Sequence, residues 1–588
     1  MISKIISVII SFAITVTGFA YNSLSSVIDS ISEMLFGIPY TVDAIKSDFF
    51  EDIKDADVIK VDGETGYVKD LLAVFVNDDM SFSEKLSLFN TCGGVLAGWC
   101  APADLYVIRY APMNYNQVIS KCEALEKKSG VALAIPVSTY KTQSNLTPND
   151  SFDADEISFE WDELNPAGSN WWLEAVQARQ AWDYSDFFNN INIGIVDSGF
   201  ETDHPELAGR ISFPSDKYAG RNRSDFHGTH VAGIIGANKN NGIGIAGICD
   251  NSKLICVDWQ PDILQIWHTE LAILFGFSAV VKAGAKVVNF SLGVSPSRTS
   301  DSLGIMDSVF TPAAFSLMMA SLLSKGYDFV AVQSAGNGDM FGDPMNADYN
   351  GHFCAINENN AFTGFTGVSV RELLNRIIIV AGADNCGNGA YMQSAYTNVG
   401  DTVDIAAPGT DIYSSTVFGD YEYLTGTSMS APIVTGIASL VWSVNPAFTG
   451  ADVKNIVCSS TESVAAVNTE LDYFYDVDLL DYPMVNAKLA VEEAIKRTDT
   501  SVGTVSGRVV DENAVEIELG GVSHTLFSDG SYKFVAKEGN GIAKVLDING
   551  TEIGSFDVSV IAGTHTQIND YVTDGSENEP IIYVERKS

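Results

Sequence analysis

Apolar and polar positions first define a small unit in the N-terminal quarter of the chain. Residues 71–76 form an apolar run and residues 105–110 alternate, so both are predicted strands, whereas 82–89 has helical spacing. A second helix is predicted because one helical face carries apolar residues, namely Val118, Ile119, Cys122 and Leu125. The apolar runs 95–99 and 131–137 predict two more strands. The order β-α-β-β-α-β over about 60–140 predicts a ferredoxin-like α+β unit.

The pattern changes at about residue 171. Short apolar strands such as 191–196 and 376–380 alternate with long helical stretches such as 264–283. This alternation predicts an α/β domain with a parallel sheet covered by helices. From residue 502 to 588 the pattern becomes short strands separated by turn pairs, among them Asp529-Gly530, which predicts a small all-β sandwich domain.

The N-terminus has the features of a secretion signal. Lys4 precedes an apolar run over 5–16, and Gly18 and Ala20 are the small residues expected before a cleavage site. A membrane anchor is the alternative, although the run is shorter than a membrane-spanning helix requires. We therefore expect a signal peptide over 1–20 and a secreted, extracellular protein with no membrane span after signal cleavage.

Composition narrows the possible partners. The 588 residues carry a formal net charge of −41, which repels phosphate backbones and excludes nucleic acid as a partner. A polar, acidic stretch over 141–168 is either an exposed loop or a processing site. Export permits disulfides, and Cys92–Cys100 and Cys354–Cys386 are two possible pairs, although eight cysteines do not determine the pairing.

Three motifs carry candidate chemistry. Asp197 ends an apolar strand before a glycine turn, where an acid is more often a cap or a turn residue. His227 opens a helix rich in small residues, and no acid lies between it and His230, as the commonest helical zinc motif would require. Ser428 follows Gly426 and begins another helix, where a serine can also be a simple cap.

The three motifs together resemble the subtilisin-like serine protease family, because they occur in the chain order Asp, His, Ser. The resemblance covers about 171–494. It implies a parallel-sheet peptidase domain in which Ser428 attacks the scissile carbonyl, His227 transfers the proton and Asp197 orients the imidazole. A non-catalytic binding protein on an inactive protease scaffold, and an esterase with the same triad, are the alternatives.

The resemblance also implies further site residues for a polypeptide substrate. Asn337 would donate to the oxyanion, although a plain turn asparagine is the alternative. The substrate would lie extended along two segments, of which the first could instead be only the end of a core strand. These segments are Ser291, Leu292 and Gly293, and Ser334, Ala335 and Gly336. The stretches 294–327 and 338–370 are longer than is usual in the family.

A calcium ion is the one implied cofactor. Residues 240–247 resemble the calcium loop of the family, and the resemblance implies ligands from the Asn241 side chain, the carbonyls of Ile243 and Ile245, and Glu206. All are oxygen ligands of the kind that calcium prefers. Glu206 stands where the family usually has Asp, and a glycine-rich turn without metal is the alternative.

The flanking units complete the predicted organisation. Residues 21–145 resemble the inhibitory propeptide of the family, which implies a self-processing zymogen with its own propeptide as a partner. Residues 146–498 would form the peptidase domain. Residues 502–588 resemble carboxypeptidase-regulatory-like β modules, whose role the sequence leaves open.

Overall fold

The fold is taken from a computed structural model of the chain. It describes residues 49–50, 58–60, 65–77, 79–80, 82–100, 103–141, 170–219, 226–260, 267–293, 302–338, 344–364, 366–385, 391–462, 482–527, 529–568, 570–573 and 582–585. The predicted signal peptide, nearly all of the predicted linker and Cys386 lie outside these residues.

The N-terminal unit is an antiparallel sheet with two helices. Its core strands follow the order β4-β5-β3-β6, and the edge strands β1, β2 and β10 extend it. In chain order the elements are β1 (Phe49–Phe50), β2 (Val58–Lys60), β3 (Thr65–Val76), α3 (Phe82–Thr91), β4 (Val95–Cys100), β5 (Leu105–Arg109), α4 (Tyr115–Glu126) and β6 (Val131–Lys141). Asn114 caps α4 through a capping box, and the buried face of this helix consists of Val118, Cys122 and Leu125.

The start of α8 (Glu270–Lys282) differs from the helix expected over 264–283. Residues 267–269 instead form β10 (Trp267–Thr269), which pairs antiparallel with β6 of the N-terminal unit. The backbone groups on the edge of β6 need a partner strand, and apolar spacing within one segment does not reveal such a pairing. The N-terminal sheet thus extends into the central part of the chain.

The central unit contains a sheet whose main strands are all parallel. The order is β18-β19-β15-β13-β12-β11-β7-β9-β8, with β7 (Asn192–Asp197) between β9 (Lys253–Asp258) and β11 (Ala285–Phe290). The remaining strands are β8 (Ile211–Ser212), β12 (Val330–Ser334), β13 (Ile377–Asn385), β14 (Tyr391–Gln393), β15 (Ile405–Pro408), β18 (Thr461–Glu462) and β19 (Met484–Val485). The antiparallel exceptions are β14 on β13 and β18 on β19.

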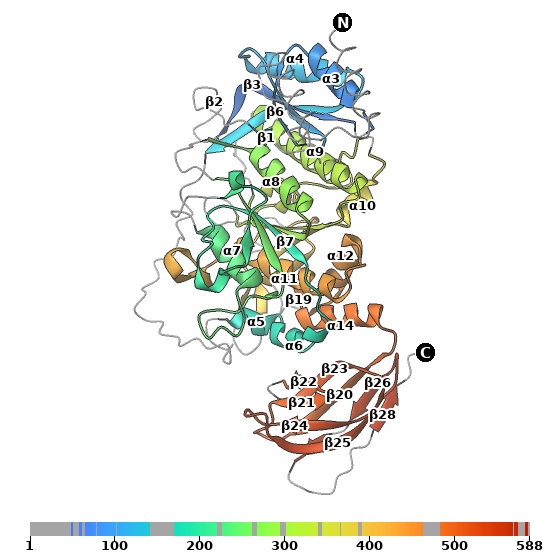
Figure 1. Cartoon of the computed structure of the whole chain (residues 1–588). Coiled ribbons are helices and arrows are strands. Elements are labelled where there is room, and N and C mark those ends of the chain that lie inside the picture. The colour runs from blue at the N-terminus through green and yellow to red at the C-terminus, as the bar shows by residue number, and fades with distance from the viewer. Residues whose placement is uncertain are drawn as a thin grey trace, which may run out of the picture.

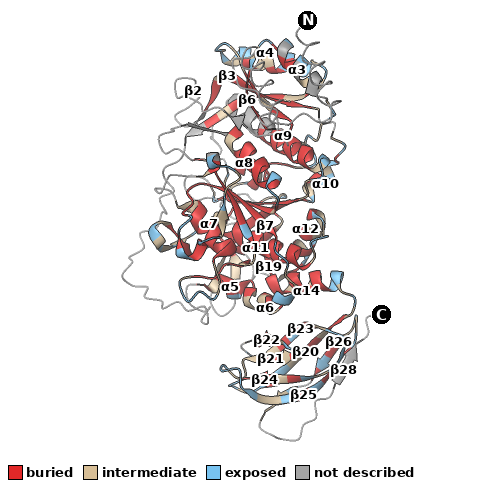
Figure 2. Cartoon of the chain, in the orientation of Figure 1, coloured by how far each residue is buried: buried red, intermediate tan, exposed pale blue. Residues whose placement is uncertain are grey.

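Helices cover both faces of this sheet (Figure 1). Ile193 and Ile195 pack in one core with α7 (His227–Gly236) and α11 (Thr427–Val444), whereas Val196 packs in another core with α8 and α9 (Ser302–Ser324). Both faces of β7 are therefore buried, as Figure 2 shows, which explains why its sequence is a continuous apolar run. The remaining helices are α5 (Trp171–Ala175), α6 (Ala178–Trp182), α10 (Val370–Leu374), α12 (Gly450–Ser459) and α14 (Ala487–Thr498).

Helix α11 is long and apolar enough to cross a membrane, judged by length and composition alone. Within the described part of the chain, however, 94% of its apolar window is buried inside the protein. It contacts α7, α12, α14 and the sheet. We conclude that α11 is a core helix.

The C-terminal unit consists of two sheets that pack against each other. One has the order β23-β20-β26-β28 with β27 beside β20, and the other has the order β22-β21-β24-β25. The strands are β20 (Val502–Val510), β21 (Glu516–Leu519), β22 (Val522–Thr525), β23 (Ser531–Lys537), β24 (Gly539–Leu546), β25 (Glu552–Val560), β26 (His565–Ile568), β27 (Tyr571–Val572) and β28 (Ile582–Glu585). Figure 1 shows this unit beside α6 and α14, at the opposite end of the protein from the N-terminal unit.

The structure tests one of the two suggested cysteine pairs. Cys92 and Cys100 are not joined by a disulfide, and the Cys92 thiol instead donates to the Phe89 carbonyl at 2.9 Å. Cys354 is buried and its thiol donates to the Ser334 carbonyl at 3.3 Å, while its suggested partner lies outside the described residues. Buried thiols hydrogen-bonded to the backbone are common packing groups.

Candidate active site

Asp197 is the last residue of β7 and lies at the carboxyl edge of the parallel sheet. Its side chain is buried, and Oδ1 accepts a hydrogen bond from the Ser198 backbone N–H at 2.7 Å. The same oxygen lies 2.6 Å from Nδ1 of His227. A buried carboxylate in this contact holds the imidazole in one orientation, with the proton on Nδ1.

The first turn of α7 brings His227 to this carboxylate. The backbone N–H of Gly228 donates to the Ser198 carbonyl at 2.7 Å, and Thr229 donates to the Gly199 carbonyl through both its N–H and its hydroxyl, each at 3.0 Å. A Cβ at Gly228 would lie 2.8 Å from both the Ser198 carbonyl and the Phe200 ring, so only glycine allows this close docking. The helix therefore begins directly on the turn that follows Asp197.

His230 has a different environment from His227. It is fully buried, and its Nε2 lies 3.1 Å from the Glu422 carbonyl. Burial lowers the pKa of His230 to about 3, so this imidazole is neutral. Within the described ranges, no group of three or more His, Cys, Asp and Glu residues could hold a metal ion.

Ser428 lies in the first turn of α11, at the end of β11. Its Oγ lies 3.3 Å from the Ser291 carbonyl, and the Ser291 hydroxyl in turn donates to the Ser428 carbonyl at 2.8 Å. The Asn289 amide donates to the Ser291 hydroxyl at 2.9 Å and accepts from the Thr435 hydroxyl at 3.0 Å. This buried network joins β11 to α11 and positions the half-buried Ser428 at the surface.

Asn337 follows β12 and is exposed. Its Oδ1 accepts two hydrogen bonds from Thr427, one from the N–H and one from the hydroxyl, each at 2.8 Å. The Thr427 hydroxyl also accepts from the Gly336 N–H at 3.0 Å. Because the oxygen is held against α11, the NδH2 group is directed elsewhere and can serve as a donor to a ligand.

The two predicted substrate segments lie on neighbouring strands. Residues 291–293 follow β11, residues 334–336 begin at the last residue of β12, and these strands pair in parallel. Gly336 has φ of 104°, a conformation that favours glycine. The sheet therefore brings both segments and Asn337 to the same edge as Asp197.

Sequence reasoning missed several residues that support this edge. Gln333 donates to the Leu292 carbonyl at 3.0 Å and accepts from the backbone N–H groups of Phe353 and Cys354 at 2.8 and 3.0 Å. Thr427 and Asn350 also bind the site strands directly. The one available signal was a polar residue, Gln333, inside an otherwise apolar strand.

The predicted calcium ligands lie partly together. Glu206 is fully buried, and its carboxylate accepts from the Ile245 N–H and the Asn241 amide, each at 2.7 Å, and from the Tyr421 hydroxyl at 3.0 Å. Ile243 is bound through its N–H to Oδ1 of Asn241 at 3.1 Å. Desolvation raises the pKa of Glu206, as expected for a carboxylate buried among neutral donors.

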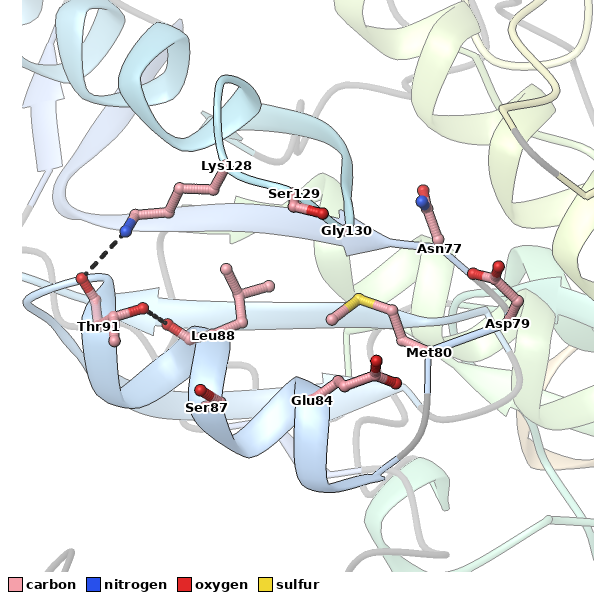
Figure 3. A pocket seen from close by; sticks show the side chains of 10 residues that line it. All are labelled: Asn77, Asp79, Met80, Glu84, Ser87, Leu88, Thr91, Lys128, Ser129 and Gly130. Atoms are coloured by element: carbon pink, nitrogen blue, oxygen red, sulfur yellow. Dashed lines mark hydrogen bonds between the residues drawn. The ribbon is translucent and has the colours of Figure 1, made fainter. Parts of the chain in front are cut away.

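A separate pocket lies in the N-terminal unit, between α3 and the turn at Ser129 and Gly130 (Figure 3). Lys128 closes one side of it by donating to the Thr91 carbonyl at 3.2 Å. None of the candidate site residues lines this pocket, so it is not part of the candidate active site.

Fold and site together define the class of protein. An acid–histidine pair, a serine at a helix N-terminus and an exposed amide all lie at the carboxyl edge of a parallel sheet, a distribution typical of a serine hydrolase. A model of the subtilase family matches residues 189–486, and the chain belongs to this family. It is a serine-type endopeptidase that acts on polypeptides.

The chain is also similar to individual known proteins. The chain is 25% identical over 426 residues to the thermophilic serine proteinase of Bacillus sp. (strain AK1), covering 72% of this chain and 89% of that protein. It is 30% identical over 272 residues to thermitase of Thermoactinomyces vulgaris, covering 46% of this chain and 80% of that one. The solved structure of fervidolysin from Fervidobacterium pennivorans has a TM-score of 0.49 and 20% identity, covering 87% of this chain and 78% of the other.

Proposed function

We propose that the chain is a secreted, self-processing endopeptidase in which Asp197, His227 and Ser428 form the catalytic triad. The observation that carries the proposal is the 2.6 Å contact between Asp197 Oδ1 and His227 Nδ1, at the same sheet edge as Ser428. Ser428 is half-buried and Asn337 is exposed, whereas Asp197 is buried. This distribution suits a nucleophile and an oxyanion donor that must meet substrate, and an acid that only orients the histidine.

The mechanism follows from these roles. His227 removes the proton from Ser428 Oγ as this oxygen attacks the scissile carbonyl carbon. Asn337 NδH2 and the Ser428 backbone N–H stabilise the resulting oxyanion. When the tetrahedral intermediate collapses, the C–N bond breaks and His227 gives its proton to the leaving amine, which leaves an acyl-enzyme. Water, activated by His227, attacks this ester and restores the Ser428 hydroxyl.

Substitution of the triad tests the assignment. We expect Ser428→Ala, His227→Ala and Asp197→Asn each to reduce peptide hydrolysis by several orders of magnitude, because the members act as a unit. The melting temperature is the matched measurement of folding. Wild type should react with a fluorophosphonate at Ser428, and Ser428→Ala should not. A wild type that neither reacts nor hydrolyses peptides would indicate a binding protein on an inactive scaffold.

We also propose that the N-terminal unit is an inhibitory propeptide. Leu71 and Phe75 of β3 share one core with Phe315 of α9, so the propeptide would dock on the peptidase domain through apolar contacts. Asp104 adds a polar anchor, because it accepts from Lys325 at the end of α9 as well as from Lys85. The last propeptide strand pairs with β10, with Thr139 opposite Thr269, so the chain would leave the propeptide along the peptidase domain.

Calcium binding at the 240–247 loop is the third part of the proposal. Glu206 supplies a buried carboxylate, and the Asn241 amide nitrogen donates to it at 2.7 Å, so this amide would have to rotate to offer its oxygen to an ion. The carbonyls of Ile243 and Ile245 belong to the same loop. These oxygen donors suit calcium, and a divalent cation would offset the cost of burying the Glu206 charge among neutral donors. The ion would stabilise the loop and take no part in the reaction.

A further inference from the structure

The segment after Asn337 folds back against the two proposed substrate strands. Asn350 is the last residue of the short helix η6 (Ala347–Asn350), and only 9% of it is exposed. A Cβ built on Gly293 would lie 1.9 Å from Oδ1 of Asn350, and one built on Gly336 would lie 3.0 Å from the same oxygen. The Asn350 amide therefore lies between the two segments, in contact with the backbone of both.

Hydrogen bonds hold this amide in place. Its Nδ2 donates to the Ser334 carbonyl at 2.9 Å, which commits the nitrogen and leaves Oδ1 as the atom nearest Gly293. The chain just beyond Asn350 is bound by Gln333, which accepts from the N–H groups of Phe353 and Cys354. The Cys354 thiol also donates to the Ser334 carbonyl. These hydrogen bonds thus hold Asn350 against the end of β12.

Asn350 lies where we expect part of a bound peptide to lie. This expected position of the peptide rests on the proposed function. A peptide that pairs with residues 291–293 and directs its scissile carbonyl toward Asn337 has one side chain directly before the scissile bond. Because β11 and β12 pair in parallel, residues 291–293 and 334–336 lie side by side at the sheet edge. In this pose we expect that side chain to point between the two segments. The Asn350 amide occupies this space.

We propose that Asn350 is a specificity-determining residue that restricts the position before the scissile bond to Gly, Ala and Ser. Longer aliphatic and aromatic side chains would meet the Asn350 amide, which is buried and donates to the Ser334 carbonyl. A serine side chain fits and can donate to Oδ1 of Asn350. The substrates are therefore polypeptides cut after small residues.

Peptide cleavage by the mature wild-type enzyme and its Asn350 variants tests the proposal. The probes are fluorogenic peptides that differ in one residue, Ala, Ser, Leu or Phe, before the scissile bond. One methylene that does not fit a pocket lowers kcat/KM by roughly 10- to 200-fold. Leu and Phe exceed Ala and Ser by more than this, so we expect the kcat/KM of wild type for Ala and Ser to be higher by at least that factor. Asn350→Gly should raise kcat/KM for Leu and Phe at least tenfold and change that for Ala little.

Two further variants keep the test decisive. Asn350→Gln retains the amide but lengthens it, so cleavage after Ala should fall as well, and this variant replaces Asn350→Gly if the latter does not fold. Asn359→Ala, an exposed position in the same segment, should leave all ratios unchanged. An active enzyme that prefers Phe or Leu, with ratios insensitive to both Asn350 variants, would overturn the inference. A chain that hydrolyses no peptide and leaves Ser428 unlabelled would instead overturn the proposed function.

Discussion

Asn337 shows how one residue depends on its neighbour. Its oxygen accepts both donors of Thr427, so its amide nitrogen is the group left to donate to a ligand. The Thr427 hydroxyl in turn accepts from the Gly336 N–H, so Thr427 holds both the proposed oxyanion donor and the proposed substrate segment. In the proposed reaction the nitrogen meets charge only in the transition state, so its loss should affect turnover more than binding.

We therefore expect Asn337→Leu to lower kcat with little change in KM. Removal of one oxyanion donor in subtilisin itself costs roughly 100- to 1000-fold, and we expect an effect in that range. Thr427→Val keeps the backbone donor but loses the hydroxyl, so its loss of kcat should be smaller. Steady-state kinetics on one peptide measures both variants, with Thr427→Ser as the control that restores the hydroxyl. Equal changes in KM and none in kcat would contradict the role of Asn337.

Glu206 is the residue at which calcium can be tested. Because a ligand bound only by the folded state stabilises it by mass action, we expect a chelator to lower the melting temperature of the mature enzyme. Glu206→Gln removes the carboxylate charge and should abolish both the chelator effect and the bound calcium. Elemental analysis after dialysis measures the metal directly. A melting temperature that chelator does not change, with no calcium in the protein, would refute the site.

At the scale of elements, α7 shows why small residues follow the candidate histidine. A Cβ at Gly233 would lie 2.4 Å from the hydroxyl oxygens of both Ser414 and Ser415 on β16 (Ile412–Ser415). β16 pairs with β17 (Tyr421–Leu424) in a two-stranded sheet. The Ser414 and Ser415 hydroxyls donate to the carbonyls of His230 and Thr229 in the first turns of α7. The position of His227 thus depends on close contact between this helix and a small sheet.

Gly233→Ala separates packing from helix propensity. Propensity alone favours alanine by about 1 kcal/mol, whereas overpacking in a core costs about 1–3 kcal/mol. We expect packing to dominate, because the two hydroxyls that an alanine methyl would meet are themselves bound to α7. The variant should melt at a lower temperature than wild type and hydrolyse peptides more slowly. A higher melting temperature with full activity would show that α7 does not need this contact.

At the scale of the whole molecule, the peptidase and C-terminal units are joined by a mostly buried polar interface. Tyr184 donates to Glu492 at 2.8 Å and accepts from the Val535 N–H at 2.9 Å. Asp183 accepts from the Thr525 N–H at 3.0 Å, and its carboxylate lies 3.9 Å from His524. Burial raises the pKa of Asp183 to about 7, although the charge of Lys488 acts against this shift. Burial, together with the charge of Lys488, lowers the pKa of His524 to about 3.

This interface predicts a pH effect that can be isolated by substitution. The pKa of the Asp183 carboxyl is 3.8 in the unfolded chain and about 7 in the folded protein. Its contribution to the free energy of unfolding is therefore fully present below pH 3.8 and is lost as pH rises through about 7. His524 acts in the opposite direction at lower pH, but it is common to wild type and Asp183→Asn. We therefore expect the melting temperature of wild type to fall relative to Asp183→Asn between pH 5 and pH 8. A constant difference across this range would contradict the raised pKa.

The last prediction concerns maturation, in which the proposed propeptide and the linker after it would be removed. If the peptidase cuts its own linker, the secreted wild type should begin between Ser138 and Asn170, and Ser428→Ala should remain one continuous chain. N-terminal sequencing of purified protein measures this, and addition of the separate segment 60–140 to the mature enzyme should inhibit it. Maturation of purified Ser428→Ala at the wild-type rate would exclude self-processing and make the linker a target of another enzyme.

The sequence by itself predicts the helices and strands whose apolar pattern is regular. It also identifies the candidate catalytic residues, because each stands in a short motif. β7 is buried on both faces and so appears as an unbroken apolar run, and Asp197, His227 and Ser428 each stand at a strand end or a helix start that the local sequence marks. Tertiary structure alone decided the contacts between distant segments. β10 became a strand because the edge of β6 lies beside it, and Asn350 contacts the two proposed substrate segments because its own segment folds back against the ends of β11 and β12. Such contacts depend on backbone edges and packing distances in space, which no local periodicity encodes.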